Sequence, residues 1–415
     1  MSTDPCATDQ QPLLSVEDAR ARILDSVLPI TGSEQLFVRQ ALNRVLAEAV
    51  ISPLNVPAFD NSAMDGYALN SQDLPSDGET ELKVAGRAMA GIPYQGRVRP
   101  GEAVRIMTGA PLPEGADTVL MQEHVEVRGD RILIGSGQQA GSNIRRAGED
   151  MATGQTVLSP GRRLTPADLG LIASLGLAEV RVKRRVRAAF FSTGDELASL
   201  GQPLGDGRIY DSNRYTLHGM LTRLDLDIID MGVIADDREA IRQAFAEAMQ
   251  IADVIFTSGG VSVGEADFIK ETLEAMGEVN FWRIKMKPGK PLAYGRLGQA
   301  VFFGLPGNPV SVMATFYQFA RPALFKLMGA EIPLPLLLRL PSAGTIRKSP
   351  GRLEYQRGIM SRDTAGDWQV QSTGRQGSHV LTSMSRANCL IILPDECAGV
   401  AAGELVTVQP FQDLI

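Results

Sequence analysis

The sequence is poor in the side chains that build disulfide bridges and zinc sites. It contains three cysteines and three histidines in 415 residues. The cysteines are odd in number and have no CxxC spacing, and the histidines are too far apart in sequence to suggest a shared metal ion. This scarcity argues against a zinc site and indicates a reducing compartment, so we expect a cytoplasmic protein.

The chain also lacks a basic excess and a long apolar run. It has 41 Lys and Arg against 48 Asp and Glu, a formal net charge of −7. Nucleic-acid binders normally show a basic excess, so we expect no nucleic-acid partner. No apolar stretch approaches the roughly 20 residues of a membrane span, so we expect no membrane insertion. The length and the ordinary hydrophobic content of 44% predict a soluble protein of about three domains.

The most informative local pattern is DVIFTSGGVSVGEADFIK, Asp253–Lys270. The apolar run at 252–256 predicts a strand that is covered on both faces of a parallel sheet. Gly259 and Gly260 then allow a ligand to approach the main chain closely. A helix predicted from Ala266 would leave N–H groups free for a phosphate or another oxyanion. Glycine turns are also common punctuation in α/β proteins, so this segment alone leaves both interpretations open.

Regular alternation of strands and helices surrounds this segment from Val186 onward. At least four strands end in turns rich in glycine and polar residues, at 192–196, 235–237, 257–265 and 305–309. A further turn, KPGKP, carries Lys287 and Lys290. In an open α/β sheet the carboxyl ends of parallel strands lie along one edge, where ligands bind. The convergence of these turns therefore predicts a binding site.

The remaining segments predict helical and β-rich parts on either side of the α/β region. Apolar spacings predict helices from Ser15 to near Pro29, at 34–48 and at 167–175. Short apolar runs between glycines and prolines at 80–134 predict a β-rich domain. Beyond a proline-rich linker, the runs LEYQRGIM, WQVQST, VLTSM, NCLIILP and ELVTVQPF predict a small C-terminal sheet or barrel.

Two polar segments in the β-rich part carry charged side chains with more than one interpretation. In PAFDNSAMDGYAL, Phe59, Met64 and Tyr67 are interpreted as apolar anchors that hold the neighbouring carboxylates; a solvated turn is the alternative. In NIRRAGED, Arg145 and Arg146 could grip an oxyanion, but a surface ion pair is the commoner explanation.

Several motifs follow one another in an order that resembles a known family. They are FDNSAMDGYA, RIMTGAPLPEGADTV, NIRRAGED, STGDEL, YDSN, TSGGVSVGEADF, KPGKP and GLPGNPVS. Together they resemble the molybdopterin molybdenumtransferase family, the bacterial MoeA proteins that insert molybdenum into the cofactor. The resemblance covers nearly the whole chain.

The resemblance implies a multidomain α/β and β protein that forms an elongated homodimer. Its expected domains are a discontinuous helical dimerisation domain (1–50 and 151–183), a β-rich domain (51–150), a central doubly wound molybdopterin-binding α/β domain (184–330) and a small C-terminal β-barrel (335–415). In the implied cleft, the β-rich domain of one subunit faces the α/β domain of the other.

The resemblance also implies a reaction. Adenylylated molybdopterin and molybdate combine, the phosphoanhydride is hydrolysed in the presence of Mg²⁺, and molybdenum cofactor and AMP are released. Molybdate is a substrate here, and Mg²⁺ is the implied cofactor. A molybdopterin adenylyltransferase and delivery proteins for apo-molybdoenzymes are implied partners.

The family's functional residues are carried over onto matching motifs of this sequence. The implied catalytic residues are Asp65, Thr108, Asp150, Glu196, Asp267 and Lys287. The implied metal ligands are Glu196, Asp236 and Asp267. The implied substrate-binding residues are Ser258, Gly259, Gly260, Ser262, Gly264, Arg283, Lys290, Pro306, Gly307, Asn308, Pro309 and Ser378.

These residue types suit the implied chemistry, because an oxyanion needs cationic donors and a pyrophosphate link needs a metal and an anion nest. The individual role of Arg283 stays open, since a lysine would serve equally as a cation there. The sequence also leaves open which carboxylates hold the metal, whether tungstate is accepted, and which proteins deliver and receive the pterin.

Two other functions compete with insertion. A molybdopterin adenylyltransferase would use the same α/β module, but it would have no use for FDNSAMDGYA, RIMTGAPLPEG or the C-terminal β segments. A non-catalytic pterin-binding scaffold would not need acidic and basic residues in the turns, and these are present.

Overall fold

The computed structural model describes residues 13–259 and 268–411. These residues form two compact units. The larger unit contains the described residues up to Glu34, the short segment Asn43–Val45 and the chain from Lys183 onward. The smaller unit contains Gln35–Leu42 and Leu46–Val182.

A six-stranded sheet in the order β16-β13-β17-β21-β20-β18 forms the centre of the larger unit. Its first four strands are mutually parallel, β20 pairs antiparallel with β21, and β18 pairs antiparallel with β20. In sheet order the strands are β16 (Asp227–Ile234), β13 (Arg187–Thr193), β17 (Val254–Ser258), β21 (Ala300–Leu305), β20 (Pro291–Leu297) and β18 (Glu278–Arg283). Every residue of β17 and β21 is buried, as expected for strands covered on both faces.

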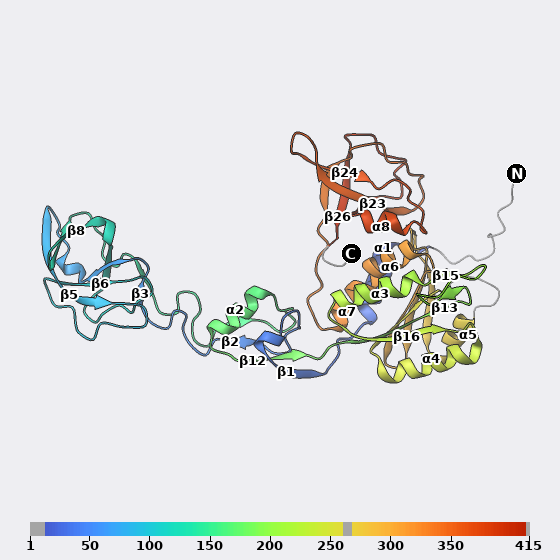
Figure 1. Ribbon diagram of the computed structural model, residues 1–415, viewed down its shortest axis with the longest axis horizontal. Helices are drawn as coiled ribbons and strands as arrows, with labels where there is room; N and C mark the ends of the chain where they lie inside the picture. The colour runs from blue at the N-terminus through green and yellow to red at the C-terminus, as the bar shows by residue number, and fades with distance from the viewer. Residues whose placement is uncertain (1–12, 260–267, 412–415) are drawn as a thin grey trace. The chain divides into compact units, whose positions relative to one another are not determined.

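Helices cover both faces of this sheet (Figure 1). On one face, Phe190 of β13 joins a core with buried residues of α3 (Ser212–Arg223) and α6 (Pro309–Thr315). On the other face, the neighbouring Phe191 joins a separate core with α4 (Arg238–Ile251) and α5 (Phe268–Met276). Because successive strand residues point to opposite faces, one strand supplies both cores. The predicted doubly wound α/β fold is therefore confirmed.

The N-terminal helix α1 (Val16–Ser26) is part of the larger unit. It begins at the predicted cap, where the Ser15 side chain accepts the Asp18 N–H at 3.0 Å. Its buried face joins the core that contains α6 and α7 (Arg321–Leu327). The π-helical segment Phe316–Ala320 connects α6 to α7 and is entirely buried.

The C-terminal part of the larger unit is a closed β structure, as predicted. Its sheet has the order β19-β23-β25-β26-β22, with β24 paired to β23. A bridge between Ser342 and Val370 joins the β22 end to β24 and closes the ring. The strands are β22 (Leu338–Pro341), β23 (Leu353–Arg362), β24 (Trp368–Ser372), β25 (Cys389–Leu393) and β26 (Leu405–Pro410).

One strand of this C-terminal sheet comes from the α/β region. β19 (Met286–Lys287) lies between β18 and β20 in sequence and pairs in parallel with β23, so that Lys287 is opposite Glu354. The pairing attaches the KPGKP turn directly to the C-terminal β domain. This attachment positions the site described below.

The smaller unit is built on a second six-stranded sheet, in the order β7-β4-β6-β5-β9-β8. The strands are β4 (Gly66–Leu69), β5 (Glu79–Ala88), β6 (Glu102–Ile106), β7 (Thr118–Met121), β8 (Val125–Arg128) and β9 (Arg131–Gly135). They confirm the β-rich part predicted at 80–134. Its helix α2 (Pro166–Ser174) corresponds to the helix predicted at 167–175 and begins after Thr165, which forms a reciprocal capping box with Asp168.

The other elements are short. They are β1 (Ser33–Phe37), β2 (Val50–Ile51), β3 (Asn61–Ser62), β10 (Ile144–Arg145), β11 (Thr156–Leu158), β12 (Glu179–Lys183), β14 (Leu197–Ala198), β15 (Ile209–Tyr210), α8 (Leu381–Arg386) and three 3₁₀ turns at Val38–Gln40, Ser71–Asp73 and Gln122–His124. No helix within the described residues is long and apolar enough to cross a membrane.

Two secondary-structure predictions are wrong. The helix predicted at 34–48 is instead strand β1 followed by a 3₁₀ turn, and β1 pairs with the distant strand β12. Phe37, which the helical spacing placed on an apolar face, is 59% exposed. The strand predicted for VLTSM is helix α8, in which Met384 is buried. A short apolar run does not distinguish helix from strand, and a partner 140 residues away leaves no local trace.

Candidate functional site: a cationic cavity beside the edge of the sheet

The carboxyl ends of the parallel strands bring the predicted turns to one edge of the larger unit's sheet, as expected. Glu196 follows β13, Asp236 follows β16, and Ser258 and Gly259 stand at the end of β17. The segment Pro306–Pro309 connects β21 to α6. β18 runs in the same direction as β21, because both are antiparallel to β20. The KPGKP turn after β18 therefore lies at the same edge.

Several buried polar atoms at this edge have no hydrogen-bond partner among the described residues. They are Ser192 Oγ, Thr257 Oγ1, Asp211 Oδ2 and Asn213 Oδ1. Buried polar groups in folded proteins are normally paired, and each exception calls for an explanation such as a ligand. The ends of β13 and β17 and the start of α3 thus offer donors and acceptors that a bound polar molecule would satisfy.

Asn213 ties two of the predicted turns together. Its Nδ2 donates to Ser258 Oγ at 2.8 Å and to the Gly307 carbonyl at 2.7 Å. The turn after β17 is equally constrained, because Gly259 has φ +94° and a Cβ there would lie 3.2 Å from the Thr193 carbonyl oxygen. A side chain at this position is disfavoured by both conformation and space.

The KPGKP turn is held from both ends. The Ile284 N–H donates to the Lys290 carbonyl at 2.7 Å, and the Leu353 N–H donates to the Lys285 carbonyl at 3.1 Å. Gly289 has φ +101°, and a Cβ there would lie 2.6 Å from Thr315 Oγ1 of α6. The turn therefore packs tightly on α6, and its lysines project from a fixed main chain.

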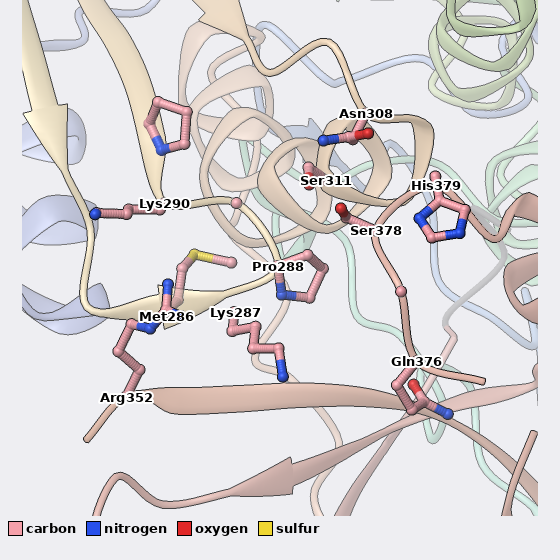
Figure 2. Close-up of a pocket in the computed structure, with 13 residues that line it drawn as sticks. Met286, Lys287, Pro288, Lys290, Asn308, Ser311, Arg352, Gln376, Ser378 and His379 are labelled. Carbon is pink, nitrogen blue, oxygen red and sulfur yellow. The ribbon is translucent and has the colours of Figure 1, made fainter. Parts of the chain in front are cut away.

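A cavity of about 630 Å³ lies between this turn, the start of α6 and the C-terminal β domain. Figure 2 shows the side chains around it. Its lining consists of Met286, Lys287, Pro288, Gly289, Lys290, Pro291, Asn308, Ser311, Arg352, Gln376, Gly377, Ser378 and His379.

The lining of this cavity is cationic although the chain as a whole is acidic. Lys287, Lys290 and Arg352 line it, and none of its described lining residues carries a carboxylate. Ser311 and Ser378 add hydroxyl groups. Such a combination suits a small oxyanion, since charged N–H donors make the strongest hydrogen bonds to it. Figure 2 shows that the Lys290 ammonium points away from the Ser378 side of the cavity, whereas Lys287 extends along the C-terminal β domain.

Lys287 stands where three cavities meet. It also lines neighbouring cavities of about 380 and 450 Å³. Its Nζ lies 3.2 Å from Glu354 Oε1, and the Glu354 side chain is only 8% exposed. The same oxygen accepts a hydrogen bond from Gln356 Nε2 at 3.2 Å.

The segment that carries Ser378 is fixed by Arg357. The Gln376 side chain accepts the Arg357 N–H at 2.8 Å and donates to the Arg357 carbonyl at 3.1 Å. The Arg357 guanidinium donates to the Gly377 carbonyl at 3.1 Å, and burial lowers its pKa to about 10. On the other side, the Val310 N–H of α6 donates to the Ser378 carbonyl at 3.1 Å. Ser378 is thus held between the β domain and α6.

The smaller unit carries a separate polar cluster. Asp65 Oδ1 accepts both the Thr108 N–H and the Thr108 hydroxyl at 2.8 Å. The backbone hydrogen bond and then the hydroxyl hydrogen bond from Thr108 hold the pKa of Asp65 below its usual value. Asp150 is exposed, as are Phe59 and Met64. The prediction that these two apolar residues anchor the loop is therefore wrong, whereas Tyr67 is buried as predicted.

Of the two adjacent arginines of the smaller unit, Arg146 forms a surface ion pair. Arg146 Nη1 lies 2.6 Å from Asp60 Oδ2, and the Ala147 N–H donates to the same carboxylate at 2.8 Å. The Ala147 bond and then the Arg146 bond lower the pKa of Asp60. This is the commoner of the two interpretations that the sequence leaves open.

Some predicted residues are not part of the cavity. Arg283 is half-buried at the end of β18 and is absent from the cavity lining. Asp65, Thr108 and Asp150 belong to the smaller unit. Gly260, Ser262, Gly264 and Asp267 lie outside the described residues. Within the described residues, no group of three His, Cys, Asp or Glu side chains could hold a metal ion.

Sequence reasoning missed several cavity residues. They are Ser311, Arg352, Gln376 and His379 in the lining, with Glu354 behind Lys287. A signal was present in GRLEYQR and RQGSH, where charged and polar residues interrupt β-type runs. Their closeness to Lys287 depends on the β19–β23 pairing, which no local pattern reveals.

Comparisons with known families agree with this architecture. A model of the MoeA N-terminal region (domain I and II) matches residues 14–176, a model of a probable molybdopterin binding domain matches 189–326, and a model of the MoeA C-terminal region (domain IV) matches 339–411. The fold and these matches define a multidomain protein built around a molybdopterin-binding type of α/β domain.

Full-length relatives narrow the class further. The molybdopterin molybdenumtransferase of Haemophilus influenzae is 46% identical over 405 residues, covering 97% of this chain and all 100% of the relative. That of a Nostoc species is 33% identical over 412 residues, covering 96% and 94%. A crystal structure of the molybdopterin biosynthesis moeA protein from Pyrococcus horikoshii OT3 matches with a TM-score of 0.84 at 28% identity, covering 96% and 100%. The chain belongs to the MoeA family.

Proposed function

We propose that this chain is a molybdenum-inserting transferase that moves molybdenum from molybdate to molybdopterin. The observation that carries the proposal is the cavity around Lys287, which gathers cations and hydroxyls without a carboxylate in its described lining. It opens beside a sheet edge where several buried polar atoms have no partner within the part of the chain that the structure describes. Relatives that align along their whole length with this chain are named molybdopterin molybdenumtransferase.

In this proposal the cavity binds molybdate. Lys287 and Arg352 offer charged donors to the dianion, Lys290 adds positive charge from the side away from Ser378, and the Ser311 and Ser378 hydroxyls donate hydrogen bonds that set its orientation. The hydrogen bonds from Arg357 and Val310 keep Ser378 in place before the oxyanion arrives. Such preorganised donors lose little entropy on binding.

The pterin substrate binds along the sheet edge. We infer that its phosphate lies against Ser258, Gly259 and the start of α6, where Pro306, Gly307, Asn308 and Pro309 form the loop. Asn213 links these two turns, and its amide oxygen has no partner among the residues that the structure describes. We further propose that the substrate is adenylylated, so that hydrolysis of its phosphoanhydride releases AMP as molybdenum is inserted.

Mg²⁺ is proposed as a cofactor that comes with the substrate. Glu196 and Asp236 follow the adjacent strands β13 and β16, and Asp267 is the third proposed ligand. The described residues contain no complete ligand group for a metal. Mg²⁺ usually takes one or two protein carboxylates and completes its shell with substrate phosphates and water. When bound, the ion would neutralise the phosphoanhydride.

The residues of the smaller unit are proposed to act in a homodimer. Asp65, bonded to Thr108, and the exposed Asp150 are then contributed to the larger unit of a second copy. We also propose a cytoplasmic location, and the adenylyltransferase and delivery proteins for apo-molybdoenzymes as protein partners. The family matches at both ends of the chain speak against a stand-alone adenylyltransferase, which would need only the central module.

The proposal is tested by supplying the purified chain with adenylylated molybdopterin, molybdate and Mg²⁺ and measuring AMP release. We expect AMP release that depends on molybdate and a product that activates an apo-molybdoenzyme. AMP release that is absent, or that ignores molybdate, would sink the proposal. A parallel reaction with ATP and molybdopterin tests the adenylyltransferase alternative.

A matched pair of variants connects the activity to the cavity. Lys287→Gln removes a lining cation, whereas Lys285→Gln removes a cation of the same turn that pairs with Asp395 outside the lining. Only Lys287→Gln is expected to weaken the dependence of AMP release on molybdate.

A further inference from the structure

Glu354 is a buried carboxylate at the back of the oxyanion cavity. It lies on β23, opposite Lys287 of β19, and is 6% exposed. Its Oε1 is 3.2 Å from both Lys287 Nζ and Gln356 Nε2. A carboxylate is rarely buried unless it is paired, and here its charged partner is a lysine that lines the cavity.

The surroundings of Glu354 are otherwise basic. Lys287, Lys290, Arg352 and Arg347 line one or more of the three adjoining cavities. Among the described residues that line these cavities, Glu354 alone has a carboxylate. It therefore balances one of the cations that an incoming anion meets.

We propose that Glu354 is a specificity-determining residue, which holds the Lys287 ammonium and makes the cavity discriminate molybdate from smaller dianions such as sulfate. The inference deepens the proposed function, on which it rests. Glu354 acts through Lys287 and is a positioning residue, since it lies outside the lining of the main cavity.

The physical reason is competition for the ammonium. An anion that uses Lys287 must draw it from Glu354 and offset the repulsion of that carboxylate. In this proposal molybdate, the larger tetrahedron, contacts Lys287 together with other donors of the lining, such as Ser378. Sulfate spans less of the cavity and makes fewer contacts. Binding sites often gain specificity from a repulsive group. Only an anion that makes the full set of contacts with the cavity overcomes the repulsion.

Without Glu354, the Lys287 ammonium could move to contact any bound dianion. The cavity would gain a positive charge, and a flexible lysine would adapt to the smaller anion. We therefore expect Glu354→Gln to bind sulfate about tenfold more tightly, or about 1.4 kcal/mol, which lies between the bulk-water and near-surface energies of one charge pair at about 4 Å, and molybdate only about twofold more tightly. The molybdate-to-sulfate preference would fall about fivefold.

A purely structural role predicts a different result, and a matched control separates the two. Lys285 and Asp395 also form an ion pair between the same turn and the C-terminal β domain, but neither lines any of the three cavities. Asp395→Asn thus removes one carboxylate and one inter-domain ion pair while leaving the cavity intact. We expect it to keep the wild-type anion preference.

The experiment measures dissociation constants for molybdate and for sulfate by calorimetry, on the full chain at constant ionic strength. It compares wild type, Glu354→Gln, Glu354→Asp and Asp395→Asn. Glu354→Asp retains the charge and should stay within about twofold of the wild-type ratio, which also tests the idea if the Gln variant unfolds. An unchanged ratio in Glu354→Gln, an equal loss in Asp395→Asn, or an Asp variant that behaves like Gln would overturn the inference.

AMP release by the wild type, measured in parallel, separates this inference from the proposed function. Molybdate-dependent release with an unchanged anion ratio in Glu354→Gln refutes the role of Glu354 alone. Failure of release, with an anion preference that Glu354→Gln abolishes, refutes insertion but leaves the cavity's specificity as inferred.

Discussion

The cationic cavity and the sheet edge lie in the same unit but differ in how their polar groups are satisfied. In the cavity wall, Gln376 is bonded to the main chain of Arg357, and Lys287 is paired with Glu354. At the edge, Ser192, Thr257 and Asp211 keep buried atoms without partners among the described residues. Among the described residues, the side chains Gln376 and Lys287 of the cavity wall are thus bonded, whereas the edge keeps several buried polar atoms without partners.

The difference suggests two modes of binding. A prearranged cavity suits a small rigid anion, whose few atoms cannot compensate for disorder in the protein. An edge with unpaired polar atoms suits a larger substrate that supplies many hydrogen bonds of its own, and it should gain more stability from that substrate. The following predictions test this division, from the largest expected effect to the smallest.

Lys287→Gln should damage the cavity most. A hydrogen bond to a charged group contributes about 1.5–3 kcal/mol, so KM for molybdate should rise roughly tenfold to hundredfold. KM for the pterin substrate should change little, because Lys287 belongs to the cavity. Steady-state AMP release with each substrate varied in turn measures both constants. Equal increases in KM for molybdate and in KM for the pterin substrate would contradict the division between the cavity and the sheet edge.

Asn213→Ala should damage the edge instead. The change removes hydrogen bonds to Ser258 and to the Gly307 carbonyl, and it leaves these groups to water or to the ligand. We expect KM for the pterin substrate to rise about tenfold and KM for molybdate to stay within about twofold. The same kinetic assay measures this. A selective effect on molybdate would mean that Asn213 serves the cavity.

Substrate binding should stabilise the edge more than molybdate stabilises the cavity. At one hundred times its Kd, a ligand adds about 2.7 kcal/mol, or about 5 °C in melting temperature for a unit of this size. The pterin substrate should produce such a rise at low concentration, and molybdate should need far higher concentrations. Thermal unfolding monitored by circular dichroism is the measurement. If molybdate raised the melting temperature at lower concentrations than the pterin substrate, the division between cavity and edge would be contradicted.

The smallest effect concerns the ion pair beside the cavity. The hydrogen bond from the Lys285 ammonium is the largest cause that lowers the pKa of Asp395, to about 2. A carboxyl whose pKa is lowered by folding stabilises the fold above its unfolded pKa of about 3.9, and this contribution is lost as the pH falls towards 2. Asp395→Asn should therefore be slightly less stable than wild type at pH 6, with the gap closing near pH 2. Urea unfolding at both pH values measures this difference in stability. A difference between wild type and Asp395→Asn that does not change with pH would show that the Lys285–Asp395 ion pair is not its source.

Much of the sheet could be predicted from sequence because its signals are local. The apolar run before Ser258 and the glycines after it predict a buried strand and a turn, and the structure has β17 and Gly259 there. The same holds for the turns after β13, β16 and β21. Given parallel strands, geometry alone brings their ends together.

The cavity could be predicted only in part because it depends on long-range pairing. Lys287 was found from its motif, but Arg352 and Glu354 come to it through the pairing of β19 with β23, about 70 residues away in sequence. The helix predicted at 34–48 failed for the same reason, since β1 pairs with the distant β12. Local propensity is a weak guide wherever a remote strand competes.

The most direct test of the division between cavity and edge is the position of molybdenum itself. Crystals of this chain soaked in molybdate would locate the metal by its anomalous scattering. The account predicts a peak in the cavity bounded by Lys287, Arg352 and Ser378, which is lost in crystals of Lys287→Gln and retained in those of Asn213→Ala. A peak at the ends of β13 and β17, with none in the cavity, would contradict it.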